Sequence, residues 1–129
     1  MAKRLVLPPA FAAAAERLKM SPGILSGSHL FLTGVTGGNP QGMPDDPEEQ
    51  FRAVFEKIKT VLAEIDLTFD AVVEMTSYHV GIREHFDLFD RIRLEYVTEP
   101  YPAWTAIEAG GLRREGAIVE VRVIATTDP

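Results

Sequence analysis

An alternating stretch near the C-terminus constrains the fold more than any other feature of the sequence. From Val119 to Ala125, valine and alanine occupy every second position, and Ile118, Glu120, Arg122 and Ile124 occupy the positions between them. Successive side chains of a β-strand point to opposite faces of the sheet, so the pattern predicts a strand with one apolar face. The pattern also places the Glu120 carboxylate and the Arg122 guanidinium on the same side. A second layer of structure must cover the apolar face.

A well-marked helix supplies that layer. Asp46 is a good capping residue, Pro47 suits the first helical position, and Glu49 can complete a reciprocal cap. Apolar residues then recur at steps of three and four and predict one stripe: Phe51, Val54, Phe55, Ile58, Val61, Leu62 and Ile65. No glycine ends this helix, and we expect Asp66 or a neighbour to adopt the left-handed conformation instead.

The remaining patterns predict a mixed α and β chain. In chain order they are a short strand at 5–7, a short helix at 9–19, a strand buried on both faces at 29–35, a loop at 34–47, a strand at 70–81 and a helix at 84–97. In the strand at 70–81, the side chains of Val73, Met75, Ser77 and His79 are expected to lie on the same face. This order predicts an α+β sandwich, a mixed sheet with two helices on one face. The opposite face would expose apolar side chains in a monomer, which favours burial against another subunit: Ile107, Ile118 and Ile124.

Composition and charge narrow the class of protein. A length of 129 residues predicts a single domain spanning 1–129. The absence of cysteine removes thiolate metal sites and cysteine nucleophiles, and it fits a reducing, cytoplasmic location. A formal charge of -6 disfavours binding to nucleic acid. No apolar run approaches the roughly 20 residues that span a bilayer, and Pro8 and Pro9 interrupt the one N-terminal run that resembles a signal peptide.

Local motifs argue against a nucleotide or a metal. The segment GVTGG at 34–38 lacks the Gly-Lys-Ser/Thr that completes a P-loop. His29, His79 and His85 lack the spacing of a helical metal site. We therefore expect neither a bound nucleotide nor a metal.

Five segments in a fixed order carry a family resemblance. They are SGSHLFLTG, NPQGMPDDPEEQ, DAVVEMTSYHVGIREHFDLFD, YPAWTAIEAGGL and IVEVRVIA, within residues 20–125. This succession resembles the RidA/YjgF family of reactive-intermediate deaminases, whose older members were labelled endoribonuclease-like. The resemblance implies a chorismate-mutase-like α+β fold and a homotrimer whose sheets line a central barrel with the helices outside. It also implies clefts between neighbouring subunits that hydrolyse enamines and imines of amino-acid origin to keto acids and ammonia, without a metal or an organic cofactor.

The implied site residues depart from the family pattern. The family motif Pro-Ala-Arg is Pro102-Ala103-Trp104 here, so the arginine that clamps the substrate carboxylate in active relatives is replaced by an aromatic ring. Glu120 matches the glutamate that helps hold the attacking water and is the implied catalytic residue. The other implied ligand-binding positions are Met20 in place of a tyrosine, Thr33 and Gly34 in place of a Ser-Gly pair, Asp90 in place of an asparagine, the small Ala106, and Arg122 in place of a second acidic residue.

Several side chains keep two interpretations. Trp104 either stacks on a flat or cationic ligand or fills the cleft or the subunit interface. Glu120 either positions a water or a ligand amine or pairs with Arg122. Asp90 either lines the cleft or is one of many solvated charges on its helix.

The expected function follows from this altered site. Without the family arginine, the cleft offers apolar surface and negative charge, so we expect carboxylate-bearing ligands to bind poorly unless Arg122 turns into the cleft. The expectation is a homotrimer with small-molecule clefts at its subunit interfaces that hydrolyses enamines or imines lacking that carboxylate. The alternatives are a non-catalytic ligand-binding or regulatory trimer and a ribonuclease, which the acidic charge disfavours.

Overall fold

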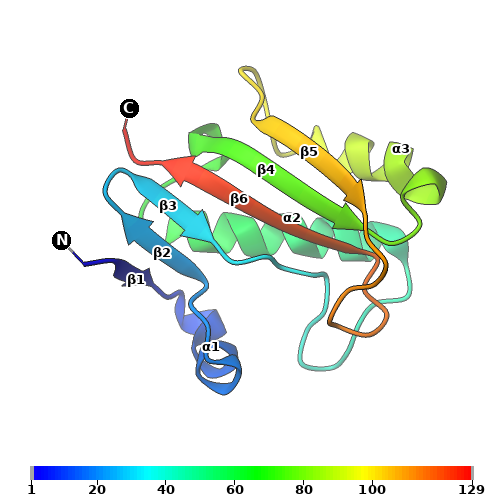
Figure 1. Cartoon of the computed structure of the whole chain (residues 1–129), viewed down its shortest axis with the longest axis horizontal. Helices are drawn as coiled ribbons and strands as arrows, with labels where there is room; N and C mark the ends of the chain where they lie inside the picture. Colours follow the sequence, from blue (N-terminus) through cyan, green and yellow to red (C-terminus); the bar gives the residue numbers. More distant parts are fainter. Residues whose placement is uncertain (1, 129) are drawn as a thin grey trace.

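One six-stranded sheet forms the centre of the molecule, in the strand order β1-β2-β3-β6-β4-β5 (Figure 1). The computed structural model describes residues 2–128. The strands are β1 (Arg4–Val6), β2 (Gly23–Ser26), β3 (His29–Leu32), β4 (Val72–His79), β5 (Ala103–Glu108) and β6 (Val119–Thr126). β4 and β5 are parallel and the other neighbours are antiparallel, so the sheet is mixed, as the sequence predicts.

The two longer helices lie side by side on one face of this sheet (Figure 1). They are α2 (Pro47–Ala63) and α3 (Ile82–Arg93), whereas the short α1 (Ala12–Leu18) lies near the start of β2. The α+β arrangement with two helices on one sheet face is thereby confirmed. The second helix ends at Arg93, before the predicted boundary, but Tyr96 beyond it still stacks on Phe55 with ring centroids 5.0 Å apart. Among residues 2–128, no helix is both long and apolar enough to cross a membrane.

The predicted stripe of α2 forms the core under the sheet. The helix begins as expected, because the Asp46 carboxylate accepts a hydrogen bond from the Glu48 backbone N–H at 3.3 Å. Asp66 adopts the left-handed conformation with φ of 60°, which confirms the expected helix end. Burying each large apolar side chain contributes about 1.5–3 kcal/mol. The stripe residues with at most 1% exposed surface are Phe51, Val54, Phe55, Ile58, Val61 and Leu62.

β6 lies between β3 and β4 and alternates as predicted. Val119, Val121, Val123 and Ala125 have at most 1% exposed surface, and Arg122 is exposed on the other side. β4 departs from its predicted alternation. A register shift between Val72 and Glu74 inserts an extra residue, so Val72 is buried and Val73 is 42% exposed. A bulge of this kind turns one residue away from the core, so the prediction that Val73 shares a face with Met75, Ser77 and His79 is wrong.

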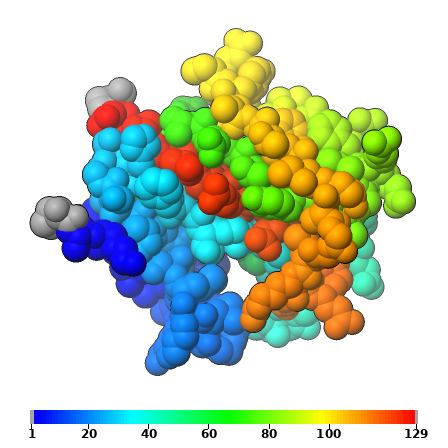
Figure 2. All heavy atoms as spheres, viewed as in Figure 1, coloured from blue at the N-terminus to red at the C-terminus, as the bar shows by residue number. Residues whose placement is uncertain are grey.

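The face of the sheet opposite the helices is uncovered in the chain between residues 2 and 128. Figure 2 shows the atoms of β6 lying open between those of β3 and β4. The prediction that β3 is buried on both faces is therefore wrong for one chain, since Leu30 is 0% exposed but Phe31 is 44% exposed. Ile107 is exposed as expected, at 41%, whereas Ile118 is half-buried because it packs against the core. We call this surface the helix-free face.

Candidate functional site

The sequence-predicted site residues separate into two groups on opposite faces of the sheet. In the β4–β5 ladder, Trp104 pairs with Met75 and Ala106 pairs with Ser77, and both partners are buried toward the helices. In the β4–β6 ladder, Glu120 pairs with Tyr78. Tyr78 directly follows the buried Ser77, so its side chain points to the other face of the sheet. Because strand side chains alternate, Trp104 and Ala106 lie on the helix side and Glu120 on the helix-free side. A small ligand on one chain cannot contact both groups.

The Glu120 group contains Met20, Thr33, Gly34 and Glu120. A Cβ atom added to Gly34 would lie 2.5 Å from Oε2 of Glu120, so the carboxylate rests on the bare glycine backbone. Val35 forms a backbone bridge to Val121, with N···O distances of 2.9 and 3.0 Å, which fixes this segment beside β6. The Thr33 hydroxyl donates a weak hydrogen bond to the Met20 sulfur at 3.9 Å. The residues thus form one polar corner beyond the end of β3.

Glu120 keeps its carboxylate free of other side chains. Within residues 2–128 it accepts no hydrogen bond and forms no ion pair, and Arg122 on the same face is exposed. The interpretation in which Arg122 neutralises Glu120 is therefore not the arrangement that the chain adopts. A half-buried carboxylate without a partner can accept a proton or a hydrogen bond from a water molecule or ligand.

Two polar side chains of α2, the buried Gln50 and the half-buried Lys57, hold the loop that carries Gly34. The Gln50 amide, 2% exposed, donates to the carbonyl oxygens of Pro44 and Gly116 at 2.8 and 3.0 Å and accepts from Ile118 N–H at 3.0 Å. The Lys57 ammonium donates to the carbonyl oxygen of Thr36 at 2.6 Å. Burial, with a contribution from a nearby arginine, lowers the pKa of Lys57. These contacts make the loop a rigid support for the Glu120 group.

The Trp104 group lies between β5 and α3. The indole stacks on Phe86 with centroids 5.5 Å apart and planes 5° apart, and its Nε1–H donates to the Ser77 hydroxyl at 2.8 Å. The guanidinium carbon of Arg93 lies 4.2 Å from the indole centroid. Arg93 also donates from Nε to Oδ1 of Asp90 at 2.9 Å. Asp90 is therefore tied to Trp104 through Arg93, and the ring has a fixed orientation.

A chain of hydrogen bonds continues from Trp104 into the core. Ser77 lies 2.8 Å from Nε2 of His79, and Nδ1 of His79 lies 3.1 Å from Nε2 of His85. Because the buried Ser77 hydroxyl already accepts from Trp104, its own hydrogen is satisfied by donating to His79 Nε2. His79 then carries its proton on Nδ1 and donates to His85. Burial and the neighbouring His85 lower the pKa of His79 to about 4, so His79 is neutral in this chain of hydrogen bonds at pH 7.

Glu108, at the end of β5, places a further carboxylate at the start of α3. Glu108 accepts backbone hydrogen bonds from Gly81 at 3.0 Å and Ile82 at 2.7 Å, and these donors lower the pKa of its carboxyl. It thus satisfies the free N–H groups of the helix. An open groove of about 490 Å³ is lined by Gly81, Ile82, Arg83, Glu84, Ala106 and Glu108. Ala106 is the sequence-predicted residue that reaches it.

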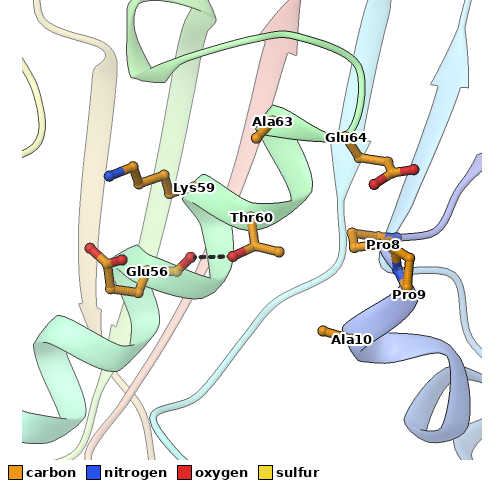
Figure 3. Close-up of a pocket in the computed structure, with 8 residues that line it drawn as sticks. All are labelled: Pro8, Pro9, Ala10, Glu56, Lys59, Thr60, Ala63 and Glu64. Atoms are coloured by element: carbon orange, nitrogen blue, oxygen red, sulfur yellow. Dashed lines mark hydrogen bonds between the residues drawn. The ribbon is translucent and has the colours of Figure 1, made fainter.

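A second groove lies away from all the predicted site residues. It measures about 400 Å³ and separates the C-terminal half of α2 from residues 8–10 (Figure 3). The Thr60 hydroxyl in its wall donates to the Glu56 carbonyl at 3.0 Å, as Figure 3 shows. Its walls carry the opposite charges of Glu56 and Lys59 without a convergent polar group. Among residues 2–128, no three His, Cys, Asp or Glu side chains are grouped as a metal site would require.

Sequence reasoning missed Arg93 and the His79–His85 pair. Arg93 follows Asp90 by three residues on a helix, a spacing that signals an ion pair but not a contact with a strand. The spacing of His79 and His85 argues only against a helical metal site. It does not show that His79, at the end of β4, lies beside His85 in the first turn of α3. The available signal was that Ser77 and His79 are polar residues on the core-facing side of β4.

These features define a small α+β domain with polar residues on both faces of one mixed sheet. The chain belongs to the family described as Endoribonuclease L-PSP, whose model matches residues 11–127. RutC family protein YjgH of Escherichia coli (strain K12) is 33% identical over 109 residues, covering 83% of this chain and 82% of that protein.

Solved structures agree with this assignment. A structure described as Structural Genomics, Protein YJGH, superposes with a TM-score of 0.87 at 29% identity, covering 100% of this chain and 99% of the other. The structure of YyfA from Yersinia pestis, described as a protein of unknown function of the conserved Rid protein family, has a TM-score of 0.83 at 27% identity, with 97% and 99% covered. The chain is therefore a RidA/YjgF family member with the α+β fold of its relatives.

Proposed function

We propose that the protein is a homotrimer of the RidA type, and that its clefts between subunits bind small molecules and hydrolyse an enamine or imine. The observation that carries this proposal is the separation of Glu120 from Trp104 on opposite faces of the sheet. Neither group alone encloses a ligand. A neighbouring copy that presents its Trp104 group to the Glu120 group would complete a site, which agrees with the cleft position that the family resemblance implies.

The helix-free face supports assembly. Phe31 and Ile107, 44% and 41% exposed, lie on this face at either side of β6 and β4. Large apolar side chains grouped on one open face are typical of a surface that another protein covers. Packing three such faces around an axis would bury them and place the helices outside, as the trimeric barrel requires.

The chemistry assigned to the cleft is the addition of water to a C=N bond. Glu120 accepts a proton as the water oxygen attacks the imine carbon, and the proton then passes to the nitrogen. The hydroxyl group of the resulting carbinolamine then loses its proton and the nitrogen takes up a second one, so that the C–N bond breaks, ammonia leaves with the electron pair, and a carbonyl product remains. An enamine first takes a proton on carbon to become the imine. The Glu120 carboxylate, which accepts no other hydrogen bond, suits this role.

The test measures assembly and ammonia separately. Light scattering gives the oligomeric state, for which we expect three chains. Ammonia release is then followed with enamines generated from amino acids and with N–H imines generated by oxidation of simple amines, using Glu120→Gln as the matched inactive variant. Release that Glu120→Gln abolishes supports the hydrolase. A trimer that releases no ammonia from either set instead supports the non-catalytic binding alternative, and a monomer contradicts the proposal.

A further inference from the structure

Arg93 places a positive charge against the Trp104 ring. Its side chain is only 11% exposed, its guanidinium carbon lies 4.2 Å from the Trp104 ring centroid, and its Nη2 lies 2.8 Å from Oδ1 of Asp90. The sequence expectation of poor carboxylate binding assumed that no guanidinium stands at Trp104 unless Arg122 turns inward. Arg93 removes that premise, because it reaches the ring from α3 rather than from the strand that carries the family motif.

Arg93 has a pair of donors left over. Asp90 uses only Oδ1, which accepts from Nε and Nη2 along one edge of the guanidinium. An arginine has five N–H hydrogens, so both hydrogens of Nη1 and one of Nη2 remain. None of them meets an acceptor in residues 2–128, and no side-chain nitrogen that is fully buried lacks a partner, so the Nη1 end reaches the surface. The Nη1 and Nη2 edge presents two parallel donors, the arrangement that matches a carboxylate.

Arg52 in the same molecule illustrates what such an edge binds. Its Nη1 and Nη2 donate to the two carboxylate oxygens of Glu95 at 2.8 and 3.0 Å, while its Nε donates to Glu48 at 2.9 Å. Both edges of that guanidinium are occupied, although the Arg52 side chain is 39% exposed. Arg93 is more deeply buried and has only one edge occupied. A nearly buried guanidinium with unused donors gains more from an incoming anion than an exposed one.

We propose that Arg93 is the ligand-anchoring residue of the cleft and receives the carboxylate of a small planar anion through its Nη1 and Nη2 edge. Trp104 supports the guanidinium from one side, and Asp90 fixes its rotation. The inference rests on the proposed cleft, and it names the ligand class of that cleft as small carboxylates such as α-keto acids. A guanidinium delivered from α3 thereby takes over a task that the residue at position 104 cannot perform.

The experiment compares pyruvate with pyruvamide, its neutral amide of the same shape. Trp104 is the only tryptophan in the chain, so its fluorescence reports binding beside Arg93 directly. Each ligand is titrated at constant ionic strength into the wild type, Arg93→Met, Arg93→Lys and the control Arg91→Met. Arg91 is exposed two residues away on the same helix, and its replacement removes the same charge without touching Trp104. Light scattering of every variant accompanies the titrations.

We expect wild type to bind pyruvate at least about tenfold more tightly than pyruvamide, the size of effect that one charge-assisted contact gives. Arg93→Met should lose this difference, Arg91→Met should keep it, and Arg93→Lys, which keeps the charge but not the fork, should fall between. The inference is overturned if wild type does not prefer pyruvate, if Arg93→Met weakens both ligands equally, or if Arg93→Lys remains trimeric and binds neither. It is also overturned if Arg93→Met merely dissociates the trimer while Arg93→Lys retains full preference.

Failure of this inference and failure of the proposed reaction give different results. Pyruvate binding that depends on Arg93 without ammonia release would keep the anchor and remove the hydrolase. Ammonia release that Arg93→Met leaves unchanged would do the reverse.

Discussion

Acid should weaken the fold through His79. The imidazole is 0% exposed and accepts the Ser77 hydroxyl hydrogen bond on Nε2, so the folded protein cannot protonate that nitrogen without breaking the chain to Trp104. Its pKa falls from the ordinary value of 6.5 to about 4, because burial and the neighbouring His85 disfavour the charge. The unfolded chain binds this proton near pH 6.5 and the folded chain does not. The stabilising effect is therefore complete above pH 6.5 and is lost as the pH falls toward 4.

The size of the effect follows from linkage. Each pH unit over which only the unfolded state holds the proton lowers the free energy of unfolding by about 1.4 kcal/mol. The interval from 6.5 to about 4 then amounts to about 3.5 kcal/mol at most. Burial also lowers the pKa of His85, which adds to the loss in the same direction.

Urea unfolding at fixed protein concentration, from pH 7.5 to 4.5, measures this slope. Trp104 fluorescence follows the local site and circular dichroism follows the whole fold. His79→Gln should be less stable at pH 7 but should show a flatter pH dependence, whereas His29→Gln, at the exposed start of β3, should keep the wild-type slope. The reasoning is refuted if wild-type stability is constant between pH 7 and 5, or if His79→Gln retains the full slope.

Three further substitutions test the site and its support. The Cβ of Gly34→Ala would lie 2.5 Å from the Glu120 carboxylate and should displace it. We expect ammonia release to fall at least about tenfold while the urea midpoint stays near wild type. Unchanged turnover would contradict the placement of Glu120 in the active site. Gln50→Leu should cost about 1–3 kcal/mol or more in urea unfolding, because it strands an N–H and two carbonyls that the amide satisfies, and a neutral result would contradict the support assigned to Gln50. Ile107→Asp, on the helix-free face, should shift light scattering toward monomers, whereas Leu94→Asp, 47% exposed at the end of α3, should not; equal effects would contradict the assigned interface.

The fold was largely predictable because its main elements carry local periodic signals. The apolar stripe of α2 and the alternating residues of β6 each bury one face of their element. A shift of one residue in the register of β6 would move all of its apolar side chains to the exposed face. The bulge at Val72–Glu74 was not predictable, since Val72 and Val73 are equally suited to either face. The exposed Phe31 was misread because an apolar run without alternation is typical of a strand with both faces covered. Within residues 2–128, helices cover only one face of this sheet.

The geometry of the candidate site was not predictable from the sequence. The resemblance placed Glu120, Trp104 and Asp90 in one cleft, and only the β4 registers reveal that the first two point to opposite faces. Arg93 looked like one of several helix charges, because nothing in the spacing of α3 indicates a ring 11 residues further along the chain. Contacts of this length depend on how β5 docks beside α3, which local patterns do not encode.

The claim that the site is shared between subunits can be tested with cross-linking that needs neither ligand nor turnover. The chain contains no cysteine, so a double variant Thr33→Cys, Ala106→Cys carries one thiol in each half of the proposed cleft. In one chain these thiols lie on opposite faces of the sheet and cannot be joined by a short bifunctional maleimide. The account predicts that the reagent links the double variant into covalent trimers on a denaturing gel, and mixed single variants into dimers only. Chains that stay monomeric on that gel would contradict the shared cleft.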